Sequence, residues 1–253
     1  MSHSRHVYDD GFFEYMVPGA HRSARAVVGL AYDMVRPASV LDVGCGRGAW
    51  LAEWIARGLR EVCGIDGSYV DLTTLTFPRA NFITHDLSQE FRLDRRFALV
   101  QCLEVAEHLP QHAAVPLIES LTRHGDVILF SAAVPGQGGE HHLNEQPLEY
   151  WRAQFAERGY SVYDPLRPLL RARTEVEPWY RYNLLLYASP AGEATLTMEA
   201  RRSRIPEAMP IPDVAPLAWR ARNFVLRRFP RAAIEVLARM KHRLVRAARQ
   251  TAR

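Results

Sequence analysis

The side chains best suited to acid–base chemistry stand in two loops that each follow a short apolar run. The first loop follows residues 97–103 and carries Glu104, Glu107 and His108. The second loop follows residues 126–131 and carries His141, His142, Asn144 and Glu145. A histidine near its ordinary pKa accepts a proton at neutral pH. The glycine-rich run GQGG at 136–139 suits a loop that closes over a bound molecule. We therefore expect proton transfer to be carried out in this second loop.

The stretch SVLDVGCGRGAW at 39–50 is the second informative segment. Gly44, Gly46 and Gly48 lie between a strand-like run and a helical pattern, where glycine lets the backbone turn sharply and approach a ligand. The positive end of the following helix would face that ligand. Dinucleotide-binding turns have a G-x-G-x-x-G spacing, which is absent here, and Asp42 disfavours a nearby pyrophosphate. The segment therefore predicts a cofactor site of another kind.

Alternating strand and helix patterns position these loops. Apolar runs predict strands at 39–43, 61–65, 81–84, 97–103, 126–131, 160–163 and 180–187. Helical spacing predicts helices at 23–35, 49–57, 113–121, 147–158, 217–228 and 232–249. Residues 1–18 are expected to form a short helix or lid, 68–80 a short or irregular helix, and 189–216 a linker or loosely packed extension. The alternation through 39–131 predicts an α/β fold with a doubly wound, mostly parallel sheet.

Four motifs in order resemble those of the class I S-adenosylmethionine-dependent methyltransferases. They are LDVGCGRGAWL at 41–51, GIDGSYV at 64–70, HDL at 85–87 and CLEVAEHLP at 102–110. The resemblance covers about residues 20–190. It implies a Rossmann-like methyltransferase fold, with seven strands of which the last is antiparallel, and S-adenosyl-L-methionine as cofactor.

The resemblance also implies which residues bind the cofactor. Asp66 would accept the ribose hydroxyls, Asp86 and Leu87 would contact the adenine, and Glu104 would contact the methionine end. The full set is Asp42, Gly44, Cys45, Gly46, Gly48, Trp50, Asp66, Gly67, Asp86, Leu87, Glu104, Tyr15 and Ser23.

The loop GQGGEHHLNEQPLEYW at 136–151 resembles a sub-group of small bacterial methyltransferases. His142, Asn144 and Glu145 match its pattern, and His141 stands at a variable position. His142 is our candidate base, with Asn144 or Glu145 orienting it or the substrate. Two alternatives remain open: solvated histidines followed by a residue that caps the next helix, or a metal site with His141, His142 and Glu145 as ligands, which adjacent histidines in a glycine-rich loop indicate only weakly. We expect no metal.

The charge is unevenly distributed. Residues 220–253 contain eleven Lys/Arg and one acid, a local charge of +10, so the +4 of the whole chain leaves −6 for residues 1–219. We divide the chain into an N-terminal lid and helix (1–36), a cofactor-binding domain (37–190) and a linker with a basic helical extension (191–253). The extension, at 217–249, could contact a membrane surface or another protein chain. Nucleic acid is not expected as a partner.

The sequence predicts an enzyme that transfers a methyl group to an oxygen of a small molecule or of a glycan or natural-product intermediate. The alternative is an enzyme of the same fold that uses the cofactor without methylation, by intramolecular cyclisation or a lyase reaction. A module that only binds the cofactor is a third possibility. Three cysteines without a C-x-x-C pair, no signal-peptide pattern and no long apolar run fit a cytoplasmic protein.

Overall fold

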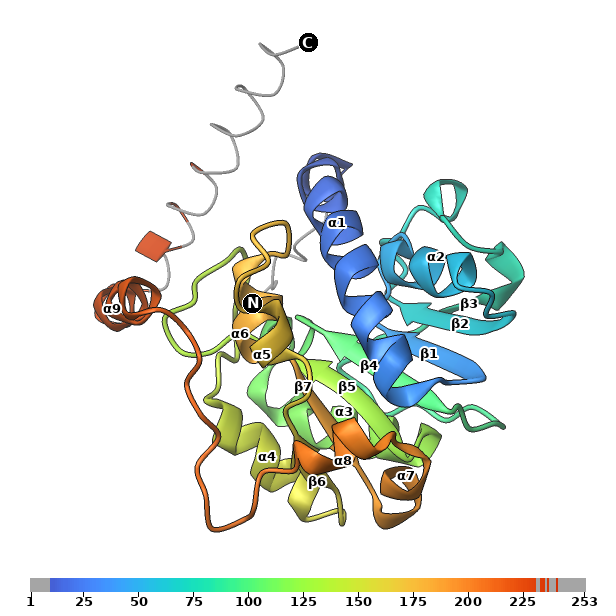
Figure 1. Ribbon diagram of the computed structural model, residues 1–253. Coiled ribbons are helices and arrows are strands. Elements are labelled where there is room, and N and C mark those ends of the chain that lie inside the picture. Colours follow the sequence, from blue (N-terminus) through green and yellow to red (C-terminus); the bar gives the residue numbers. More distant parts are fainter. Residues whose placement is uncertain (1–9, 231–232, 235, 237–239, 241–253) are drawn as a thin grey trace.

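A computed structural model describes residues 10–230, 233–234, 236 and 240, with side chains from Gly19 onward. Within them the chain forms one seven-stranded sheet with the order β3-β2-β1-β4-β5-β7-β6. Figure 1 shows the sheet in the middle of the molecule with helices on both of its faces. The strands are β1 (Ser39–Val43), β2 (Glu61–Asp66), β3 (Phe82–Thr84), β4 (Leu99–Leu103), β5 (Val127–Ser131), β6 (Ser161–Tyr163) and β7 (Leu185–Ala188).

The strand directions are those of the expected fold. β3, β2, β1, β4 and β5 pair in parallel, whereas β7 is antiparallel to both β5 and β6. All residues of β1, β4 and β5 are buried, as expected for parallel strands that helices cover on both faces. The prediction of a doubly wound, seven-stranded methyltransferase sheet with an antiparallel last strand is therefore confirmed.

The helices enclose the sheet on both faces. They are α1 (Asp10–Val35), α2 (Ala49–Ala56), α3 (Ala114–His124), α4 (Leu148–Ala156), α5 (Arg167–Leu170), α6 (Pro178–Asn183), α7 (Pro190–Thr195), α8 (Met198–Arg202) and α9 (Leu217–Leu226). Short 3₁₀ turns occur at Leu72–Thr74, Arg79–Asn81, Ala106–His108 and Gln111–Ala113. The first two of these turns are the short, irregular structure expected for 68–80.

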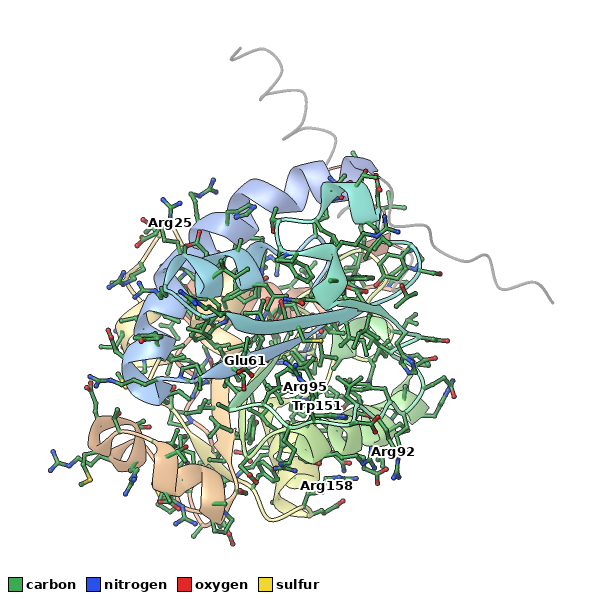
Figure 2. The ribbon with its side chains drawn as sticks, turned by 90° about the vertical axis from the view of Figure 1, so that its right-hand side faces the viewer. Arg25, Glu61, Arg92, Arg95, Trp151 and Arg158 are labelled. Atoms are coloured by element: carbon green, nitrogen blue, oxygen red, sulfur yellow. The ribbon has the colours of Figure 1, made fainter. Side chains whose placement is uncertain are left out.

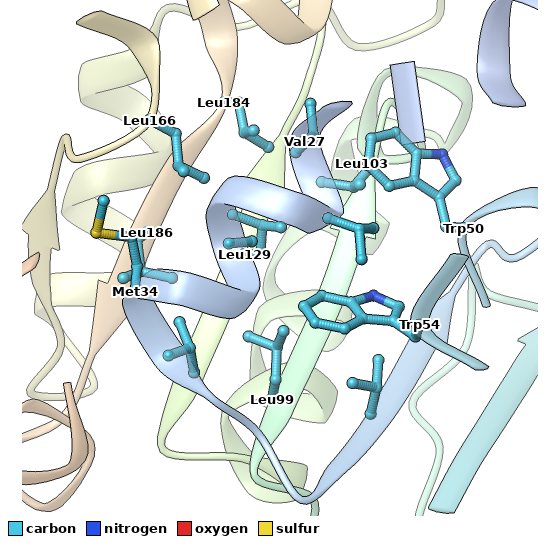
Figure 3. Packing of buried hydrophobic residues seen from close by; sticks show 14 of the residues in the cluster. Val27, Met34, Trp50, Trp54, Leu99, Leu103, Leu129, Leu166, Leu184 and Leu186 are labelled. Carbon is cyan, nitrogen blue, oxygen red and sulfur yellow. The ribbon is translucent and has the colours of Figure 1, made fainter. Parts of the chain in front are cut away.

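Two clusters of buried apolar residues hold the layers together. On one face, α1 crosses the sheet and packs Val27 and Met34 against Leu99, Leu129 and neighbouring side chains (Figure 3). On the other face, α3 and α4 pack on the sheet, and Trp151 of α4 stacks at an angle on Phe130. In the view with side chains, Trp151 lies toward the interior while Arg25 and Arg92 reach outward (Figure 2). The core therefore fixes the position of the sheet, and the loops that follow the carboxyl ends of its strands can carry the functional site.

Three local predictions need correction. The N-terminal helix does not begin at residue 23: α1 is one helix from Asp10 to Val35, and Pro18 lies within it. The strand predicted at 180–187 is wrong in its first half. There Pro178 begins α6, and the strand β7 starts only at Leu185. An aromatic run therefore did not indicate a strand at this position, because tertiary packing overrides such a propensity.

The segment predicted as a linker also contains regular structure. α7 and α8 pack on the sheet, with Leu196 and Ala200 buried in the same cluster as α1. The backbone N–H of Thr197 donates to the carbonyl of Met34, 3.1 Å away. The predicted helix at 217–228 is α9, whereas most of the helix predicted at 232–249 lies outside the described residues. None of the described helices is both long and apolar enough to cross a membrane.

Candidate active site

The glycine turn joins β1 to α2. Gly44, Gly46 and Gly48 all have positive φ, at 80°, 52° and 88°. A Cβ built on Gly44 would overlap Val105, and one on Gly48 would overlap Phe77. The N–H of Gly44 donates to the carbonyl of Ile65 in β2, 2.8 Å away. Glycine is therefore required twice, for the backbone conformation and for the close approach of neighbouring side chains.

Asp66 ends β2 and lies against this turn. Its carboxylate accepts hydrogen bonds from the N–H groups of Gly46 (2.6 Å) and Gly67 (2.7 Å), and a third from the hydroxyl of Tyr69. Burial raises the pKa of Asp66, while these three donors act in the opposite direction. The carboxylate is thus fixed in place by the backbone, and the Tyr69 hydroxyl holds one of its oxygens.

Asp42 in β1 is the second buried acid. It is 2% exposed, and its Oδ2 atom has no hydrogen-bond partner among the described residues. Burial raises its pKa to about 7, the side chain of Gln101 opposes this rise, and the charge of Asp66 adds to it. A buried carboxyl of this kind is costly to ionise without a compensating cation.

A second pair of acids follows β4. Glu104 has a positive φ of 54°, and its Oε2 accepts a hydrogen bond from the Gln137 amide, 2.8 Å away. Glu107 is buried, and neither of its carboxylate oxygens has a hydrogen-bond partner in the described structure. Burial raises the pKa of both groups, and the charge of Glu104 raises that of Glu107 further. The charges of these two acids and of Asp42 and Asp66 all act on Cys102, so the four lie close together.

His142 and Glu145 form the pair that the sequence indicated. The His142 Nδ1 and the Glu145 Oε1 are 2.8 Å apart. The same carboxylate accepts hydrogen bonds from the N–H groups of Gly136 (2.7 Å) and Gly138 (2.8 Å). Burial would raise the pKa of Glu145, but the His142 contact and the two N–H donors leave it lowered. Glu145 is therefore an ionised group that fixes the histidine ring and leaves Nε2 on the far side.

The loop also carries the other two residues predicted to act with His142. Asn144 is buried, its Oδ1 accepts from Gln146, and its Nδ2 has no hydrogen-bond partner among the described residues. The Asn144 N–H donates to the carbonyl of Glu107, 3.0 Å away. His141 has a positive φ of 56° and is partly buried. Neither Asn144 nor Glu145 caps α4, whose N-cap residue is Pro147 without a side-chain hydrogen bond.

One group of side chains has the composition of a metal site. Ligand atoms of Glu107, His108 and His142 lie within 4.8 Å of one another. The rings of His108 and His142 are perpendicular, with centroids 5.0 Å apart. Carboxylate and imidazole ligands suit a divalent transition metal. This set differs from the one considered from sequence, because Glu145 is already engaged by backbone donors.

Three of the residues predicted to bind the cofactor are Ser23, Trp50 and Tyr15. Ser23 is fully buried in α1, and its hydroxyl accepts a hydrogen bond from the Glu177 N–H, 3.0 Å away. Trp50 is buried against Tyr180, with ring centroids 5.0 Å apart. The side chain of Tyr15 lies outside the described part of the chain. The hydroxyl of Ser23 therefore serves the contact between α1 and the segment before α6.

The remaining predicted residues follow the ends of β1, β2 and β3. Cys45 lies buried in the glycine turn, the N–H of Gly67 donates to the Asp66 carboxylate, and Leu87 is buried. Asp86 accepts two hydrogen bonds from Ser88, which closes the turn after β3. Gly44, Gly46 and Gly48 form the turn itself.

Sequence reasoning missed Gln137 and undervalued Glu107. Gln137 is buried and bonds Glu104 through its Nε2, while its Oε1 accepts from Asn183, 2.7 Å away. Its position inside the glycine-rich run was the only local signal for it. Glu107 lies in the quoted segment after β4, but its burial depends on the loop that packs over it from residues 143–144.

Buried carboxylates at the ends of three adjacent parallel strands favour a cationic ligand, because each is stabilised when a positive charge replaces water. S-adenosylmethionine has a sulfonium and an ammonium group. The glycine turn, the acid at the end of β2 and the strand order together define a class I S-adenosylmethionine-dependent methyltransferase. Ligands of such open sheets bind at the carboxyl ends of the strands.

Comparisons with known proteins agree with this class. A family described as "Methyltransferase domain" matches residues 6–170, and the chain belongs to that family. A ubiquinone biosynthesis O-methyltransferase from Alkalilimnicola ehrlichii is 34% identical over 122 residues, which is 44% of each chain. The match thus spans less than half the length of that relative.

Solved structures show the same fold at low sequence identity. DesVI from Streptomyces venezuelae has a TM-score of 0.52 at 17% identity, over 75% of this chain and 99% of its own. The glycopeptide N-methyltransferase MtfA has a TM-score of 0.50 at 18% identity, over 67% of this chain and 90% of its own. These structures show the fold, and the family match shows that the chain belongs to the methyltransferase class.

Proposed function

We propose that this methyltransferase transfers the methyl group to a hydroxyl oxygen of a small molecule or of a glycan or natural-product intermediate, with His142 as the general base. The observation that carries the proposal is the contact of 2.8 Å between the His142 Nδ1 and Glu145. With Nδ1–H donating to the carboxylate, Nε2 is the unprotonated nitrogen and can accept a proton. An O-methyltransferase among the relatives supports oxygen as the acceptor atom.

The chemistry needs little else from the protein. Methyl transfer from a sulfonium is an in-line displacement, so the acceptor oxygen must lie opposite the departing sulfur at about 3 Å from the methyl carbon. A hydroxyl loses its proton as it attacks, and a positioned base contributes about 10²–10⁴-fold to such a step. Glu145 holds the imidazole in one tautomer and stabilises the imidazolium that forms, and Asn144 supplies a buried amide N–H for the acceptor.

The acceptor atom is tested first with methyl-labelled cofactor. The protein is incubated with labelled S-adenosylmethionine and a small-molecule extract, and the products are analysed by mass spectrometry and NMR. A labelled methyl group on oxygen supports the proposal. A labelled methyl on nitrogen or carbon contradicts it, and labelled aminobutyryl carbons without methyl transfer indicate the non-methylating use of the cofactor.

The role of His142 is tested with that product in hand. We expect His142→Ala to lower kcat by about 10²-fold or more and to leave the Kd of S-adenosylmethionine within a few-fold. His112→Ala is the matched control, because His112 is exposed in the turn before α3. If a chelator abolishes wild-type activity and a divalent ion restores it, His142 acts as a metal ligand with Glu107 and His108, and the base assignment is wrong.

A further inference from the structure

The outer face of α9 carries large apolar side chains that no other part of the described structure covers. Leu217, Phe224 and Val225 are 78%, 55% and 52% exposed, and Phe229, directly after the helix, is 48% exposed. Positions 217, 221, 224, 225 and 228 share one side of a helix by their spacing. We call Leu217, Phe224, Val225 and Phe229, with the arginines Arg220, Arg227 and Arg228 beside them, the α9 outer face.

The opposite side of α9 packs against the loop at 136–146 that carries His142 and Glu145, which we call the catalytic loop. Asn223 is buried, and a Cβ built on Gly136 would overlap its carbonyl oxygen. Arg222 donates to the carbonyl of Gln137, 2.9 Å away, and Trp219 contacts the ring of Tyr182, with centroids 5.8 Å apart. Figure 1 shows α9 at the edge of the molecule beside the loop that precedes α4. The inner contacts thus fix the rotation of the helix and hold its apolar side outward.

The charges on this face select the kind of partner. The Arg228 guanidinium lies over the Phe224 ring, 3.7 Å from the ring centroid. A positive charge and an apolar ring are therefore adjacent on this face. Among the described residues, Asp213 pairs with Arg220 of this face at 3.0 Å. Residues 220–253 have a charge of +10 in sequence, against −6 for residues 1–219. An exposed face that combines Phe, Leu and Arg is typical of helices that lie on anionic membranes.

Within the described helix α9, the face is small for an interface with a second protein chain. α9 has ten residues, a length of about 15 Å, whereas a stable protein interface buries about 800 Å² on each partner. A bilayer surface requires only shallow insertion of a few apolar side chains next to basic residues, which attract the phosphate groups. We propose that the α9 outer face docks on an anionic lipid bilayer, with the catalytic loop directly behind it.

Vesicle binding by the full chain tests the proposal. The probes are vesicles of phosphatidylcholine alone and of phosphatidylcholine mixed with phosphatidylglycerol, and binding is measured by co-sedimentation. We expect binding to the anionic vesicles only, weakened by added salt, and at least fivefold weaker for the double variant Phe224→Ser and Phe229→Ser. The matched control is Leu169→Ser with Met198→Ser, two apolar residues on α5 and α8 that are 42% and 61% exposed.

The controls keep the test decisive. Circular dichroism and the Kd of S-adenosylmethionine establish that each variant is folded, independently of the acceptor and of His142. Absence of binding to anionic vesicles at low salt overturns the proposal, as does binding that the double variant leaves unchanged. A dimer in light scattering that Phe224→Ser converts to a monomer, without vesicle binding by the wild type, assigns the face to a second copy of this chain and also overturns it.

Discussion

At the scale of the residue, Asp66 shows how a binding group is set in place by the backbone. Two N–H groups, from the glycine turn and from Gly67, hold its carboxylate, and such charge-assisted bonds are about twice as strong as neutral ones. The Tyr69 hydroxyl is the third donor, and its ring lies over Gly67, where a Cβ would overlap it. Asp66 is predicted to accept hydrogen bonds from the ribose hydroxyls of the cofactor. These hydroxyls would therefore compete with the Tyr69 hydroxyl for the carboxylate.

This competition predicts the effect of Tyr69→Phe. The variant keeps the ring and removes only the competing hydroxyl. We expect the Kd of S-adenosylmethionine to fall by about three- to tenfold, because a hydrogen bond of this kind is worth about 0.5–1.5 kcal/mol net. Isothermal titration calorimetry measures the change in Kd. The matched control is Tyr32→Phe, in the last turn of α1. An unchanged or higher Kd would show that the hydroxyl does not compete with the cofactor.

At the scale of the element, the loop at 136–146 depends on its contact with α9. Gly136 has a φ of 82° and no room for a Cβ against the backbone of α9. Gly136 and Gly138 also donate their N–H groups to Glu145. The helix, the loop and the His142–Glu145 pair are therefore mechanically connected, although Gln137 and Arg222 are separated by 85 residues.

Gly136→Ala tests this connection. Gly58 offers a matched control, because it has a φ of 93° after α2 but nothing within 4 Å of a built Cβ. Both substitutions force alanine into a left-handed conformation, at a cost of about 1–2 kcal/mol. We expect Gly58→Ala to reduce only stability, whereas Gly136→Ala also moves α9 and lowers kcat by several-fold. Equal effects of the two variants on thermal unfolding and on kcat would contradict the connection.

The elements also show what sequence could and could not predict. The parallel strands followed from apolar runs bounded by turn residues, and the glycine turn from its spacing. The prediction of a strand at 180–187 was wrong in its first half because it rested on the aromatic residues there. The helix signal was Pro178, since proline is favoured at the first position of a helix. The contact of Arg222 with Gln137 had no local signal, since it depends on how the chain returns to the loop.

At the scale of the whole molecule, the sheet gathers four acids with raised pKa values at one edge. Burial raises the pKa of Asp42 to about 7 and raises those of Asp66, Glu104 and Glu107. In the folded protein these carboxyl groups stay protonated to a higher pH than in the unfolded chain, where they ionise at the ordinary carboxyl pKa. Between about pH 4 and pH 7 the folded state keeps the Asp42 proton that the unfolded chain has released, so the contribution of this group to stability falls as the pH rises through this range.

The cofactor should reverse this loss. We expect the protein without cofactor to be less stable at pH 7.5 than at pH 5.5, with Asp42 contributing about 2 kcal/mol to the difference, since one group changes the free energy of unfolding by at most about 1.36 kcal/mol per pH unit. The sulfonium keeps its charge over this range and favours the ionised carboxylates, so S-adenosylmethionine should raise Tm more at pH 7.5 than at pH 5.5. Thermal unfolding at both pH values, with and without cofactor, measures this.

Asp42→Asn removes one of the four titrating groups and should reduce the pH dependence. A wild-type Tm that rises from pH 5.5 to 7.5 without cofactor, or an Asp42→Asn variant with the full pH dependence, would show that these acids are ionised before the cofactor binds.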